Sequence, residues 1–148
     1  RNIVAEETYR QWTPDDVRTL ESDIVVVTLP GDDLAGLRLS LLTMLVNTND
    51  AFTGINALAL EDMAPGDSRV LNTVSYDSGT EANSELAAEI PGPAGGGEGF
   101  NAARNDRADQ VTMHPGAVTA DDGLPTSDLN QSHRWDNPVA RVRIVRVQ

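Results

Sequence analysis

Cysteine and lysine are both absent from this sequence of 148 residues. Without cysteine there is no disulfide framework, no thiolate metal site and no cysteine nucleophile, and a chain of this length can bury a core without such staples. All 11 basic residues are therefore arginines, against 23 acidic residues, which gives a net charge of −12. Such a surface repels a phosphate backbone, so nucleic acid is not an expected partner.

Long apolar runs are also missing. The most apolar stretch, residues 37–46, is interrupted by Arg38, Ser40 and Thr43, so we expect no transmembrane segment. We recognise no signal peptide in these residues, and because the sequence starts at Arg1 without methionine we expect a processed or trimmed chain. The Lys-free, Asp-rich composition suits a protein in high salt, although a genome biased toward Arg codons explains it equally well.

Histidine is scarce, which limits the enzymes to be considered. His114 and His133 are the only two, and neither lies in a His-Glu-x-x-His frame or near a Gly-x-Ser-x-Gly nucleophile motif. The glycine run at 91–99 is not followed by Gly-Lys-Ser/Thr, so it does not predict phosphate binding. We therefore expect no enzyme, and a hydrolase that uses Asp or Glu pairs is the weakest of the alternatives.

The patterns that remain predict an all-β protein. Aromatic residues make up only 4% of the chain, while 12 Gly and 8 Pro favour many turns. Runs of apolar and β-branched residues predict strands at 23–30, 37–48, 52–60, 69–76 and 139–147. In the last run Ala140, Val142 and Ile144 alternate with Arg141 and Arg143, which predicts one core face and one wetter face.

Two regions are less regular. Residues 78–138 read as a long loop region, which at least one further strand must cross, at 110–114 or at 116–120. Residues 1–22 read as an N-terminal extension with a short helix, because Thr13 is a good cap and Pro14 suits the first helical position. The predicted organisation is therefore this extension followed by a β domain at 23–148.

Two acidic loops stand out as a candidate metal site. Asp50 follows the apolar strand at 37–48, and Asp77 and Glu81 follow the strand at 69–76. Adjacent strands that run the same way would bring these loops together, and hard oxygen ligands from loops are what calcium prefers. The alternative is that the Asp side chains cap their own loops by accepting hydrogen bonds from backbone amides.

Five blocks of this sequence, in this order, resemble the spondin N-terminal domain family. They are LSLLTMLVNTNDAFTG at 39–54, VLNTVSYDSGTEANSE at 70–85, IPGP at 90–93, HPG at 114–116 and WDNPVARVRI at 135–144. The resemblance covers residues 23–147, and the opening strand of the family is not evident in residues 1–22. It implies a secreted protein and an antiparallel β-sandwich like the calcium- and phospholipid-binding sandwich modules, with a calcium ion at its loop end.

The resemblance also implies which residues bind calcium. The family's acidic ligands fall on Asp50 and Asp77, whereas a third ligand position falls on Gly31, beside Asp32 and Asp33. Asp33 and Glu81 are therefore the candidates for the third ligand.

Two functions follow as expectations. The first is an extracellular, non-enzymatic adhesion or recognition module that binds a glycan or a protein with calcium-ordered loops. The second is a structural subunit of a fibre or surface layer, in which a neighbouring copy supplies the missing opening strand by strand addition.

Overall fold

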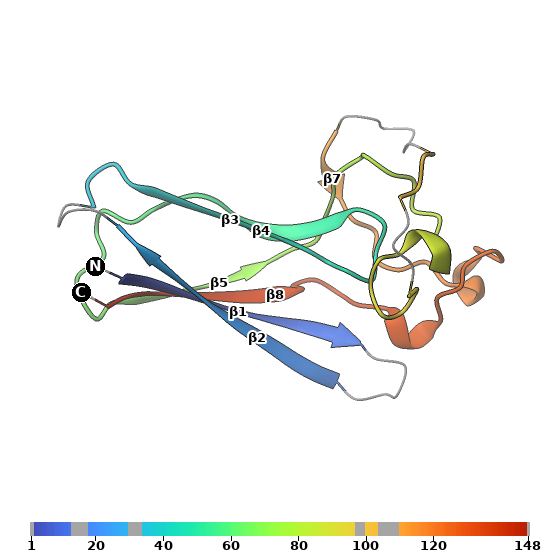
Figure 1. The fold of residues 1–148 in the computed structure, drawn as a ribbon, viewed down its shortest axis with the longest axis horizontal. Coiled ribbons are helices and arrows are strands. Elements are labelled where there is room, and N and C mark those ends of the chain that lie inside the picture. The colour runs from blue at the N-terminus through green and yellow to red at the C-terminus, as the bar shows by residue number, and fades with distance from the viewer. Residues whose placement is uncertain (1, 13–17, 30–33, 97–99, 104–109, 148) are drawn as a thin grey trace.

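The computed structural model describes residues 2–12, 18–29, 34–96, 100–103 and 110–147, with side chains described from residue 24 onward. The described chain is mostly β-structure, in two antiparallel four-stranded sheets (Figure 1). Sheet A has the order β2-β1-β8-β5 and sheet B the order β3-β4-β6-β7. The strands of sheet A are Asn2–Trp12 (β1), Arg18–Thr28 (β2), Ser68–Thr73 (β5) and Ala140–Arg146 (β8). Those of sheet B are Arg38–Met44 (β3), Ala51–Ala59 (β4), Tyr76–Asp77 (β6) and Thr112–Met113 (β7).

The all-β prediction is confirmed, and the predicted strands correspond to β2, β3, β4, β5 with β6, and β8. The further strand expected near 110–114 is β7. The alternation predicted for residues 139–147 is also confirmed: Val142 and Ile144 are fully buried, while Arg141 and Arg143 are exposed.

The N-terminal helix is the main difference from the sequence prediction. Residues 13–17, where it was expected to begin, lie outside the described residues, and the segments on both sides are strands. β1 pairs with β2 over eleven residue pairs and with β8 over seven, from Ile3–Arg146 to Tyr9–Ala140. Pairing with β1 supplies backbone hydrogen-bond partners for residues 18–22, and this tertiary contact outweighs their local helix propensity. Residues 2–12, in which the sequence revealed no strand, therefore form β1, which pairs within sheet A.

Side chains from both sheets form one core. Ile55 of β4 lies in a cluster with Val142 and Ile144 of β8, and partly buried leucines of β3, β4 and β5 pack around it. Thr53 of β4 donates to the hydroxyl of Thr73 in β5 at 2.7 Å, which links the sheets by a buried polar contact. The segment 68–77 belongs to both sheets, because it leaves sheet A after β5 and enters sheet B as β6.

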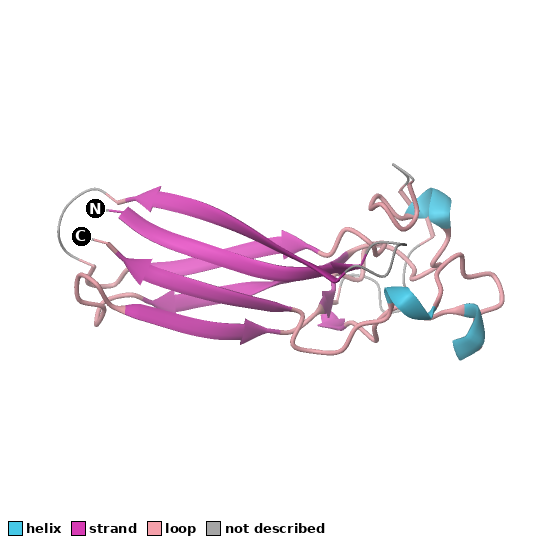
Figure 2. Ribbon diagram, turned by 90° about the horizontal axis from the view of Figure 1, so that it is seen from below, coloured by secondary structure: helices cyan, strands magenta, loops and turns pink. Residues whose placement is uncertain are grey.

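The long region after β6 is not extended loop but a folded cap at one end of the sheets (Figure 2). It contains three short 3-10 helices, Ala87–Glu89 (η1), Ala120–Asp122 (η2) and Gln131–His133 (η3). A second small core of Ile90, Ala117 and Leu129 holds it together. No helix in the described ranges is long and apolar enough to cross a membrane. The start of β1 and the end of β8 lie at the opposite end from this cap (Figures 1 and 2).

Candidate functional site

The two acidic loops meet at the end of the molecule that carries the cap. Asp50 ends the turn between β3 and β4, and Asp77 is the last residue of β6. Because β3 and β6 both run antiparallel to β4, they run the same way, and Asp77 pairs directly with Ala51. The sequence prediction that these loops come together is confirmed.

Asp50 organises the loop that follows β6. Its Oδ2 atom accepts hydrogen bonds from the hydroxyls of Ser78 and Thr80 at 2.7 and 2.8 Å, and from the backbone N–H groups of Thr80 and Glu81 at 2.7 and 2.9 Å. Partial burial raises the pKa of Asp50, but these donors together outweigh it and hold the pKa below its usual value. Asp50 is thus a charged anchor for residues 78–81.

Asp77 caps the same loop from the inside. It is only 2% exposed, and its Oδ1 accepts from the backbone N–H of Gly79 at 2.8 Å while its Oδ2 accepts from the Asn83 side chain at 2.7 Å. Glu81 Oε2 accepts from the backbone N–H of Asn101 at 3.1 Å. The loop-capping interpretation of the aspartates is therefore seen directly. Asp33 lies outside the described residues.

Several oxygen atoms near these carboxylates are left without a donor. Asn49 Oδ1, Asp50 Oδ1 and Asn83 Oδ1 are buried and make no hydrogen bond. Their residues are connected, since the amide nitrogen of Asn49 donates to Ser84 Oγ at 3.4 Å, next to Asn83, which itself donates to Asp77. A buried acceptor without a donor costs about 1–3 kcal/mol. Each of these three oxygen atoms, in two adjoining loops, keeps a lone pair free for a further donor.

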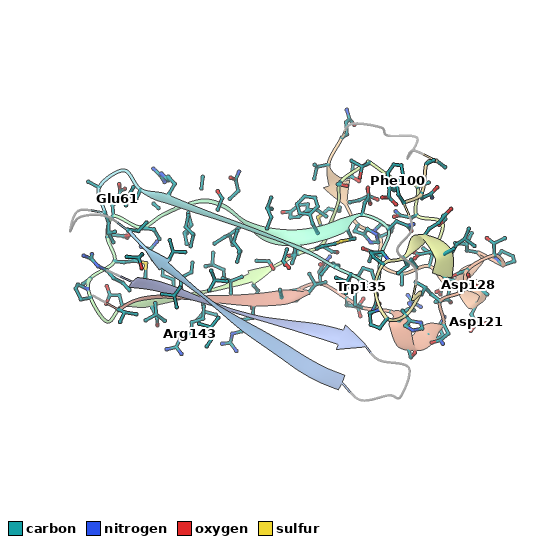
Figure 3. All side chains as sticks on the ribbon, viewed as in Figure 1. Glu61, Phe100, Asp121, Asp128, Trp135 and Arg143 are labelled. Carbon is teal, nitrogen blue, oxygen red and sulfur yellow. The ribbon has the colours of Figure 1, made fainter. Side chains whose placement is uncertain are left out.

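His114 lies close enough to Asp77 and Asp50 to be affected by their charges. Its ring stacks on Trp135 at 5.4 Å, and its Nδ1 accepts from the backbone N–H of Gly116 at 3.0 Å, which leaves the proton of the neutral ring on a buried, unpaired Nε2. Burial lowers the pKa of His114, although the charges of Asp77 and Asp50 act in the opposite direction. Trp135 is half-buried against the cap core, near the loop end in Figure 3, so it is a packing aromatic.

A shallow groove of about 500 Å³ opens beside Asp50. Its acidic lining residues are Asp50 and Glu81, and Leu42, Met44 and Phe52 are among its apolar ones. The groove therefore combines carboxylates with exposed apolar side chains.

The apolar side of the groove continues as a row across sheet B. Met44 pairs with Phe52, Phe52 with Tyr76 and Tyr76 with Met113, so all four side chains lie on one face. The Phe52 and Tyr76 rings stack at 5.6 Å, and Met44 and Met113 are 43% and 56% exposed. Methionines and aromatic rings form adaptable contact surfaces, and sequence patterns alone did not reveal this one.

Glu85 is a second feature that the sequence did not reveal. It is 2% exposed, has a left-handed backbone (φ 56°) and accepts from the backbone N–H of Val118 at 3.1 Å. Burial raises its pKa to about 7, against the smaller opposing effect of the Val118 donor. Because the folded-state pKa lies above the unfolded value of 4.5, the contribution of Glu85 to stability is full below pH 4.5 and is lost as the pH rises through 7.

Glu85→Gln is therefore expected to raise the free energy of unfolding at pH 8 by up to about 3 kcal/mol and to leave it nearly unchanged at pH 4.5. Urea unfolding of both proteins at the two pH values measures this difference. Glu61→Gln, an exposed carboxyl at the opposite end (Figure 3), is the control and should change stability by less than about 0.5 kcal/mol at either pH. An equal effect of Glu85→Gln at both pH values would contradict the ionisation argument.

Within the described ranges no three His, Cys, Asp or Glu side chains are placed so that they could hold one metal ion. A metal ion held by described residues alone at this end would need amide oxygens in addition to carboxylates. Comparison of the chain with known protein families, with curated proteins and with solved structures finds no match.

Proposed function

We propose that this chain is an extracellular, non-enzymatic recognition module of the spondin type, in which a calcium ion orders the loops beside the binding groove. In this proposal the two sheets form a β-sandwich, as in calcium- and phospholipid-binding modules. The shared core of Ile55, Val142 and Ile144 supports that arrangement. The groove and the row from Met44 to Met113 would be the contact surface for a glycan or a protein.

The calcium proposal is carried by one observation, the three buried oxygen atoms of Asn49, Asp50 and Asn83 that have no donor. Calcium accepts carboxylate and amide oxygens together and does not require three acidic side chains. Asp50 suits this role because its Oδ2 is fixed by four donors while its Oδ1 remains unbonded. Asp77 and Glu81, each engaged with loop donors, would support the site through the loop that they hold.

A calcium titration followed by thermal unfolding tests this proposal. At a calcium concentration about 100 times Kd, the Tm should rise by roughly 5–10 °C, and magnesium at the same concentration should have a much smaller effect. Asp50→Asn should abolish the shift, whereas Glu61→Gln, which removes the same charge at the opposite end, should retain it. A wild-type Tm that does not respond to calcium would refute the site.

The recognition proposal has its own test. Wild-type protein on a glycan array, with calcium and with a chelator, should bind a restricted set of sugars in a calcium-dependent manner. Met44→Glu places a charge in the apolar side of the groove and should reduce that signal at least about tenfold, while Val70→Glu, on exposed β5, should not. Uniform silence on the array would leave protein ligands as the class to test by pull-down with the same two variants.

A further inference from the structure

The face of sheet A that points away from sheet B gathers positive charge in an otherwise acidic chain. Residues of β8 alternate between the core and this outer face, where Arg141 and Arg143 are exposed, and Figure 3 labels Arg143 there. The pairing of β1 with β8 and β2, together with the two-residue alternation of strands, places Arg10 and Arg18 on the same face. Among the outer-face positions of the four described strands, Glu6 is the one acidic residue. Four arginines and one glutamate give this face a charge of +3, so the rest of a chain that totals −12 carries −15.

The four arginines follow one another as a regular stripe across the sheet. Arg143 and Arg141 are two residues apart on β8, which separates them by about 7 Å along the strand. Arg10 is the diagonal cross-strand neighbour of Arg141, and Arg18 is that of Arg10, at about 7–8 Å for each step. Among the described side chains neither Arg141 nor Arg143 takes part in an ion pair. The stripe is therefore a row of like charges whose mutual repulsion an extended polyanion would relieve.

The neighbours of the stripe are polar and carry few aromatic rings. The cross-strand row through Arg141 consists of Asn72, which is exposed, then Arg141, Thr8 and Ser22. Amide and hydroxyl groups beside arginines suit a polymer that carries hydroxyl groups as well as acidic ones. Trp12 is the only aromatic residue at the outer-face positions of these described strands, whereas sites for single-stranded nucleic acid combine basic residues with several stacking rings.

We propose that this stripe binds a single chain of an acidic polysaccharide, with its carboxylate or sulfate groups on the arginines and its hydroxyl groups on the polar row. The planar fork of arginine binds such oxyanions through two parallel hydrogen bonds. A membrane or a nucleic-acid duplex presents a broad anionic surface, which would also face the flanks of a chain that carries −15 outside this face and would be repelled. A single polymer chain contacts only the stripe. This surface lies on the other sheet from the groove and does not depend on calcium.

Isothermal titration calorimetry with oligosaccharides of heparin, which is sulfated, and of alginate, which carries carboxylates alone, is the test, in low salt with a chelator. Wild-type protein should bind at least one of them, with an affinity that falls as the salt concentration rises. A net charge of −12 opposes non-specific binding of any polyanion, so binding itself reports a local site. The double variant Arg141→Gln/Arg143→Gln should raise the Kd at least about tenfold. Arg38→Gln, which removes a charge from exposed strand β3, is the control and should leave the Kd within about twofold.

Glu6→Gln provides a measurement that damage to the fold cannot imitate. It removes the one acidic residue at the described positions of this face, directly opposite Arg143 in the register, and should lower the Kd at least about threefold. Glu61→Gln makes the same change of charge in the turn after β4 and should leave the Kd unchanged.

Two further variants separate this surface from the groove. Val70→Glu places a carboxylate opposite Arg143 and should weaken polysaccharide binding, whereas Met44→Glu, at a similarly exposed position in the groove, should not. The calcium-dependent signal on the glycan array should respond to the same two variants in the opposite way, so either proposal can fail alone. No binding by the wild type, an equal loss in Arg38→Gln and the double variant, or tighter binding of oligothymidylate or of phosphatidylserine vesicles would overturn the inference.

Discussion

Replacing Asp50 with alanine is expected to lower the free energy of unfolding by about 4 kcal/mol, even in calcium-free buffer with a chelator. One carboxylate oxygen accepts four hydrogen bonds from residues 78–81, and bonds to a charged group contribute about 1.5–3 kcal/mol each when buried. Partial exposure of Asp50 reduces that total, which is why we expect about 4 kcal/mol. Chemical unfolding at pH 7 measures the change.

The pH dependence separates this role from a general packing defect. Since the folded-state pKa of Asp50 lies below its usual value of 3.8, its contribution to stability is present above that pH and is lost as the pH falls through the folded-state pKa. The difference between wild type and Asp50→Ala should therefore shrink in acid. Ser78→Ala, which removes one of the four donors, should cost about 1 kcal/mol. A loss below 1 kcal/mol for Asp50→Ala would show that the loop is held by other contacts.

Gly54→Ala is the second substitution from which we expect a large effect, with a loss of about 4 kcal/mol or failure to fold. Gly54 pairs with Leu42 in the β3–β4 ladder, and a methyl group there would overlap the Leu41 carbonyl oxygen and lie 2.9 Å from its carbon. These are backbone atoms, so the clash can be relieved only by separating the two strands. Expression yield, far-UV circular dichroism and Tm report the outcome.

Gly36→Ala is the matched control for this change. Gly36 lies in a turn with φ 72°, and an added methyl group meets no atom within 4 Å, so the only cost is the left-handed backbone, about 1 kcal/mol. A similar loss for both variants would mean that conformational strain, and not the approach of β3, determines the effect at Gly54.

The sequence predicted the strands that carry their own signal. β8 was recognisable because Val142 and Ile144 alternate with arginines, and β4 because its residues are apolar or β-branched. β1 and the first half of β2 were not, since residues 2–12 mix polar and apolar positions and their pairing with β8 joins segments about 140 residues apart. A contact between residues so far apart in the sequence does not change local secondary-structure propensity, whereas Thr13 and Pro14 give a strong local signal for the start of a helix.

The candidate site was predicted in part, for a similar reason. Asp50 and Asp77 could be selected because each follows a strand, and strand order then brings them together. Asn49, Asn83 and His114 could not, because what distinguishes them is a buried atom without a partner. Whether an atom is buried and without a partner depends on all the residues that surround it in the fold. The only related signal in the sequence was that Asn49 directly precedes Asp50.

The pairing of Ile3 with Arg146 also determines how the protein would respond to tension. A pull on the start of β1 and the end of β8 acts on neighbouring antiparallel strands from the same end. The hydrogen bonds between them would then be loaded one after another, and the strands would separate like a zipper at low force. If the chain is anchored through either of these ends, the cap faces outward as the exposed tip, and a string of such modules joined end to end would yield early under load.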